Sequence, residues 1–122
     1  MDSKFKKIVF TGIILAIVIL LFTIIDHSIH GLEVAWSVPD YYFRNKIPFG
    51  FLWGVIGLFI ASKFKNIWLK ALIVSGMIAT ILQVRYFLEG YALSFIFIFL
   101  LFHFLILYFL SLGMFKVFSK YL

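Results

Sequence analysis

Uncharged, largely apolar residues form four stretches along the chain, and charged residues separate these stretches. The stretches cover residues 8–25, 47–62, 71–84 and 90–115. A hydrocarbon core of about 30 Å requires about 20 residues of helix. The first and last stretches approach or exceed this length. The third reaches it when the apolar residues on both sides join the helix, which places Arg85 inside the helix near one membrane face.

This pattern predicts an all-α, polytopic membrane protein, because only helices and closed barrels satisfy their backbone hydrogen bonds in lipid. We expect a single integral membrane domain over residues 1–122 that folds as an antiparallel bundle of four transmembrane helices. The expected spans are residues 8–26, 47–63, 67–88 and 91–114, with an outer amphipathic, interfacial segment at residues 27–46.

The second span is short, so two arrangements stay open for it: a full crossing, or a re-entrant hairpin. In a full crossing, Lys46 and Lys63 extend from its ends toward the membrane surface. Pro48 is expected in the first turn, where a proline leaves no backbone N–H unpaired. Small residues then recur three or four apart, which favours close helix packing in lipid. They are Gly50, Gly54, Gly57 and Ala61.

The composition agrees with a membrane protein and excludes several other classes. Of the 122 residues, 65% are apolar and 13% are charged, which is too little polar surface for a soluble domain of this size. There are no cysteines, so disulfides and thiolate metal sites are excluded. No glycine-rich phosphate loop, nucleophile elbow or pair of transmembrane carboxylates occurs in the sequence.

The formal net charge is +6, and the eleven lysines and arginines lie singly or in short clusters beside the apolar stretches. Eight of them fall near the two termini or between residues 63 and 70, and three fall on the other side of the expected membrane. The positive-inside rule therefore predicts a multi-pass protein of the cell membrane with both termini in the cytoplasm. We expect the lipid bilayer, and no nucleic acid, as a partner of these charges.

The first candidate site lies in the segment that follows the first span. If helix continues across residues 26–37, Asp26, His30 and Glu33 fall within one narrow arc, with His27 at its edge. Two carboxylates and two imidazoles bind zinc, iron or manganese when three of them converge. Three interpretations stay open: an interfacial helix with polar groups in water, a divalent-metal or acid–base site, and pH sensing by the histidines.

Arg85 is the second candidate, because an ionised guanidinium inside an apolar helix is costly unless it is paired or solvated. We predict an ion pair of Arg85 with Asp26, with Glu89, or with both. The alternative is an anion-binding or lipid-binding site in which Arg44 and Tyr86 lie near Arg85.

His103 is the third candidate, because it lies about 20 Å along the last span and a neutral imidazole there needs a hydrogen-bond partner. The candidate partners on other helices are Gln83, Thr80, Thr11 and Thr23. Haem is not expected, since His27 and His30 are placed at the outer edge, too far in depth from His103 to share one iron. Phe95, Phe102 and Phe109 form a stripe that either stacks an aromatic ligand or packs against lipid and neighbouring helices.

Few polar residues lie within the spans, and a bundle of this size encloses little cavity volume. The first functional hypothesis is therefore a non-enzymatic subunit or accessory of a larger membrane complex, with other membrane subunits or further copies of the chain as partners. The alternatives are an outer metal-binding or acid–base site and a lipid or anion site at Arg85.

Overall fold

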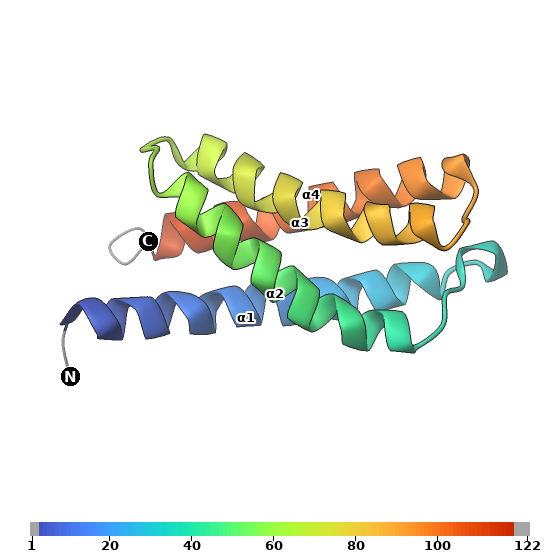
Figure 1. Cartoon of the computed structure of the whole chain (residues 1–122), viewed down its shortest axis with the longest axis horizontal. Helices are drawn as coiled ribbons and strands as arrows, with labels where there is room; N and C mark the ends of the chain where they lie inside the picture. The colour runs from blue at the N-terminus through green and yellow to red at the C-terminus, as the bar shows by residue number, and fades with distance from the viewer. Residues whose placement is uncertain (1–2, 119–122) are drawn as a thin grey trace.

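The computed structural model describes residues 3–118, and every regular element in this part of the chain is helical. The elements are α1 (Ser3–His30), the short 3-10 helix η1 (Val34–Trp36), α2 (Tyr41–Ala61), α3 (Ile67–Leu88) and α4 (Leu93–Val117). Figure 1 shows the start of α1, the α2–α3 connection and the last turn of α4 at one end of the molecule. The α1–α2 and α3–α4 connections lie at the other end, called the loop end below.

Three of the helices, α1, α3 and α4, are long and apolar enough to cross a membrane. Large apolar side chains also point outward, as on Ile24, Phe59 and Phe109. The predictions of an all-helical fold and of helices able to cross a membrane are therefore confirmed for the described residues. The remaining helix, α2, has 21 residues but places Arg44 and Lys46 in its first two turns, which shortens its apolar part.

The helix boundaries differ from the expected ones except in α3, which covers Ile67–Leu88. The largest difference is in α2, which begins at Tyr41, directly after Pro39 and Asp40. Pro48 therefore lies inside this helix and not in its first turn. The added turns are stabilised by packing, because they bury Tyr42, Phe43 and Lys46 inside the bundle.

The amphipathic helix expected across residues 26–37 does not form. Instead α1 continues to His30, and the chain turns at Gly31, whose amide donates to the carbonyl of His27 at 3.2 Å. Glycine favours this exit because it is a poor helix former. Glu33 then has an extended backbone with φ of −138°, so it leaves the arc that Asp26 and His30 share.

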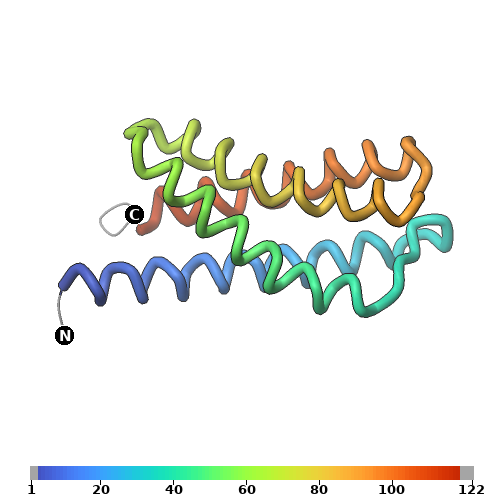
Figure 2. The backbone as a smooth tube through the Cα atoms, viewed as in Figure 1, coloured from blue at the N-terminus to red at the C-terminus, as the bar shows by residue number. Residues whose placement is uncertain are grey.

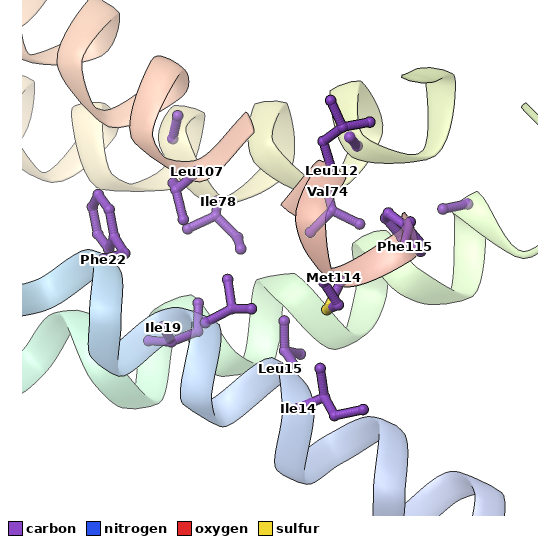
Figure 3. Close-up of a cluster of buried hydrophobic side chains, with 14 of the residues drawn as sticks. Ile14, Leu15, Ile19, Phe22, Val74, Ile78, Leu107, Leu112, Met114 and Phe115 are labelled. Carbon is purple, nitrogen blue, oxygen red and sulfur yellow. The ribbon is translucent and has the colours of Figure 1, made fainter. Parts of the chain in front are cut away.

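The larger of two buried apolar clusters lies between the helices, mostly in the half of the bundle away from the loop end. Its side chains come mainly from α1, α3 and α4, with Ala61 from α2, and those labelled in Figure 3 include Leu15, Ile19, Val74, Ile78, Leu107 and Phe115. Figure 2 shows α2 running obliquely from the end of α1 to the start of α3. Its glycines permit this crossing, because a Cβ on Gly57 would lie 3.2 Å from Cα of Val74.

The aromatic stripe of the last helix does not form one surface. Phe95 is buried against Tyr86, and Phe102 packs against Trp36. Phe109 instead points outward. The seven-residue interval therefore reflects packing at one end of α4 and exposure at the other.

Candidate functional site

Six polar side chains meet inside the bundle toward the loop end, and we call them the polar cluster. They are Asp26 and His30 of α1, Lys46 of α2, Gln83 and Tyr86 of α3, and His103 of α4. None of the six residues is more than 6% exposed. All four α-helices contribute, so the cluster exists only in the assembled bundle.

The carboxylate of Asp26 is the centre of the polar cluster. Its Oδ1 accepts a hydrogen bond from Nε2 of His103 at 2.8 Å, and its Oδ2 accepts one from Nζ of Lys46. Nε2 of His30 lies 3.3 Å from the same Oδ1. A fully buried carboxylate is costly unless it is paired and hydrogen-bonded, and the contacts from Lys46 and His103 satisfy both needs.

The ion pairs differ in part from those expected from the sequence. Arg85 lies 3.9 Å from Glu89, one of the two expected partners, but Asp26 pairs with Lys46 instead of Arg85. Lys46 was expected to extend from the end of a short span. Because α2 begins at Tyr41, Lys46 lies in its second turn and points into the bundle.

The hydrogen bonds of His30 fix the position of its ring protons. Its Nδ1 lies 2.7 Å from the carbonyl oxygen of Trp36, which only accepts, so Nδ1 carries a proton. In the neutral ring Nε2 then presents a lone pair to the polar cluster. Tyr86 Oη, 3.3 Å away, donates to this nitrogen and accepts from Nζ of Lys46 at 2.8 Å. Stacking on Phe99, with ring centroids 3.9 Å apart, holds the imidazole plane.

His103 contacts Gln83, one of its expected partners, at 2.6 Å between Nδ1 and Nε2 of the amide. The other amide atom, Oε1 of Gln83, is buried and has no hydrogen-bond partner among residues 3–118. Rotating the amide by 180° brings this oxygen to Nδ1, where it can accept a hydrogen bond from the imidazole N–H. Gln83 therefore supports either neutral form of His103: Nε2–H donating to Asp26, or Nε2 with a free lone pair.

Three atoms of the polar cluster form a candidate metal-binding set. Oδ1 of Asp26, Nε2 of His30 and Nε2 of His103 all lie within 4.8 Å of one another. Zinc ligands at 2.0–2.2 Å in a tetrahedral arrangement are about 3.3 Å apart. The two contacts from Oδ1, at 2.8 and 3.3 Å, are close to this spacing. Two imidazoles and one carboxylate suit zinc, iron(II) or manganese.

This set differs from the candidates of the first site. Asp26 and His30 belong to it, but His27 is exposed and packs its ring against Phe43 at 4.7 Å. Glu33 is exposed at the start of η1. Successive helical residues are about 100° apart, so around α1 His30 lies about 40° from Asp26, whereas His27 lies about 100° from it. Only His30 reaches the polar cluster.

The expected difference in depth between His30 and His103 is wrong, since their ring centroids are 6.1 Å apart. Helical side chains lean toward the start of their own helix. His30, the last residue of α1, therefore leans back into the bundle. His103 leans toward the start of α4, which lies at the same loop end (Figure 1). Because both side chains point this way, the two rings meet although their Cα atoms lie at different heights in the bundle.

The remaining candidates lie outside the polar cluster. Thr80 and Arg44 are exposed. The hydroxyls of Thr11 and Thr23 bond to carbonyls of their own helix, at Lys7 and Ile19 respectively. Threonine commonly bonds back to its own helix in this way, which leaves no demand for a partner on another helix.

Sequence reasoning missed Lys46 as a member of the polar cluster and gave Tyr86 a different place, beside an anion at Arg85. One feature of the sequence could have indicated Lys46: Asp26 needs a cation at a similar depth in the membrane. The expected span began after Lys46, so Lys46 was placed outside the bundle. Lys46 and Tyr86 also line a pocket of about 270 Å³ between α2 and α3.

Comparison with protein-family models, with curated proteins and with solved structures finds no match to this chain.

Proposed function

We propose that this protein binds one divalent transition-metal ion between its membrane helices, with Asp26, His30 and His103 as ligands. In this proposal α2 completes a bundle of four antiparallel spans, and both termini lie in the cytoplasm. The uneven distribution of lysine and arginine supports that orientation. The loop end and the ion then lie near the outer membrane face.

The proposal depends on one observation: three ligand atoms converge, and the second ring nitrogen of each histidine has a hydrogen-bond partner. A histidine that binds a metal nearly always donates its other ring N–H to a carbonyl or a carboxylate, which orients the ring. The bond from Nδ1 of His30 to the Trp36 carbonyl is of this kind. The unpaired Oε1 of Gln83 is available for the same role at Nδ1 of His103. Metal binding would thus give a buried orphan oxygen its partner.

The hydrogen bonds of Asp26 are compatible with an ion on one side of the carboxylate. Lys46 contacts Oδ2, which leaves Oδ1 for the ion; the proton between Oδ1 and His103 would move away, and the Tyr86 hydroxyl would turn from Nε2 of His30. Three protein ligands leave at least one coordination position open, as in zinc sites that bind a further ligand. A role as a subunit of a larger membrane complex stays a prediction, and a metal-binding bundle is compatible with it.

Metal stoichiometry tests the proposal directly. The purified full chain is stripped with a chelator, loaded with cobalt(II) or zinc, and measured by elemental analysis and by cobalt ligand-field absorption. We expect one ion per chain in the wild type and none in His30→Ala or His103→Ala. His27→Ala is the matched control, because His27 is an exposed histidine of the same helix, and it should keep the ion.

Two results would remove the metal proposal. One is a wild-type chain that takes up no ion at micromolar free metal. The other is equal uptake by the wild type and His103→Ala, because the ion would then bind elsewhere. In either case the polar cluster is a hydrogen-bond network that stabilises the packing of the four helices.

Gln83 gives a second, graded prediction. Gln83→Leu removes the group that orients His103 but leaves the three ligands in place. Loss of such an outer contact typically weakens metal affinity by about 10–100-fold. Competition with a chelating dye measures this shift, and Gln83→Glu, which restores an acceptor oxygen, should recover most of it. An affinity in Gln83→Leu equal to that of the wild type would mean that Gln83 does not orient the ligand.

A further inference from the structure

The pocket between α2 and α3 is a second candidate site, separate from the proposed metal ligands. Its wall is mostly apolar, with Phe49, Ile81 and Val84 among its side chains. Its charged lining groups are Lys46 toward the polar cluster, and Arg85 with Glu89 at the end of α3. Lys46 is already paired with Asp26, so Arg85 is the lining cation that a ligand can reach. An apolar pocket with cationic groups fits a molecule that has an apolar body and an anionic group.

Arg85 is the group best placed to bind that anion. Its guanidinium stacks on the ring of Tyr42 at 4.6 Å, which holds its plane. The ion pair with Glu89, at 3.9 Å, is too long for a hydrogen bond, and both side chains are partly exposed, at 34% and 44%. No hydrogen bond joins the guanidinium to another residue of the described chain. Its N–H donors therefore remain available for two parallel bonds to a phosphate.

The surroundings of the pocket favour a lipid over a free anion. Phe49, Val84 and Leu88 line the pocket and are also exposed, Leu88 by 77%. In the membrane arrangement proposed above, these side chains face acyl chains, and Arg85 lies near the level of the lipid head groups. The planar guanidinium of an arginine matches a phosphate through two parallel hydrogen bonds, and a lipid phosphate lies at this level.

We infer that the α2–α3 pocket binds one anionic phospholipid, with its phosphate on Arg85 and its acyl chains along the exposed apolar residues of α2 and α3. Glu89, nearly half exposed, turns to water when the phosphate replaces it at Arg85. This inference uses the membrane orientation of the proposed function and does not depend on the metal ion.

Native mass spectrometry of the full chain released from nanodiscs tests this inference. The nanodiscs contain phosphatidylglycerol in an excess of phosphatidylcholine, and the measured quantity is the number of phosphatidylglycerol molecules retained per chain. We expect one in the wild type and about a tenfold weaker retention in Arg85→Gln, the size expected for losing hydrogen bonds to a charged group. Arg44→Gln is the matched control, because Arg44 is exposed and lies outside the pocket lining. It should retain the lipid.

A second variant separates lipid binding from the fold. Val84→Trp fills part of the pocket and leaves Arg85 in place, so it should also release the lipid while the unfolding temperature of lipid-free protein stays close to that of the wild type. Equal retention of phosphatidylglycerol by Arg85→Gln, or equal retention of phosphatidylcholine by the wild type, would overturn the inference. Displacement of the lipid by millimolar inorganic phosphate would also overturn it, because the site would then bind a free anion. None of these outcomes bears on the metal stoichiometry.

Discussion

Asp26→Ala is expected to lower the free energy of unfolding by about 3–5 kcal/mol, the largest effect of any single change considered. The substitution leaves Lys46 buried without its counter-ion and removes the acceptor for His103. Breaking a buried ion pair by removing one partner costs this much because the remaining charge is uncompensated. Equilibrium unfolding in mixed detergent micelles with increasing dodecyl sulfate measures the difference.

Two further variants show whether the cost comes from the unpaired charge. Asp40→Ala removes an exposed carboxylate whose side chain makes no capping hydrogen bond at the start of α2. It should change stability by less than about 0.5 kcal/mol. The double variant Asp26→Leu with Lys46→Met removes both charges and should recover most of the lost stability. A double variant as unstable as Asp26→Ala would show that the lost hydrogen bonds, and not the stranded lysine, set the cost.

Gly57→Val is expected to destabilise the bundle by about 3 kcal/mol, at the upper end of the range for overpacking. A Cβ at this position would lie 3.2 Å from Cα of Val74, which is a backbone atom and cannot move without its helix. The valine therefore forces α2 and α3 apart along their contact. Because α2 and α3 also carry Lys46, Gln83 and Tyr86, we expect weaker metal binding in this variant. Unfolding in the same micelles and the cobalt titration measure both effects.

The control for Gly57 is Gly76→Ala on the neighbouring helix. No atom lies within 4 Å of the position that its Cβ would take. Alanine is the better helix former by about 1 kcal/mol, so this variant should be as stable as the wild type or slightly more stable. Wild-type stability in Gly57→Val would mean that α2 and α3 do not pack at the observed distance in the membrane.

Local patterns in the sequence predicted the features that local physics determines. The apolar content and the charged breaks indicated four helices, and α3 begins and ends at the expected residues. A buried imidazole needs a hydrogen-bond partner, and on this ground Gln83 was correctly predicted as a partner of His103. Each of these inferences depends on one helix, or on one unsatisfied group, and needs no knowledge of how the helices are rotated.

The membership of the polar cluster could not be predicted, because it depends on helix rotation and on side-chain direction. His27 and His30 were both candidate ligands, yet only His30 is buried in the polar cluster. Lys46 was placed at a membrane surface because the second uncharged stretch begins directly after it, and Pro48 suited a helix start there. Burial of Tyr42 stabilises the earlier start, and this packing is invisible in the hydrophobic pattern.

The distribution of the polar cluster over all four α-helices sets an order of events during synthesis. Asp26 leaves the ribosome before any of its partners, and Lys46 follows 20 residues later. At about 5–20 residues per second, that delay is about 1–4 s, whereas His103, 77 residues later, takes about 4–15 s. Lys46, the counter-ion of Asp26, is therefore available long before His103 of the last helix is made.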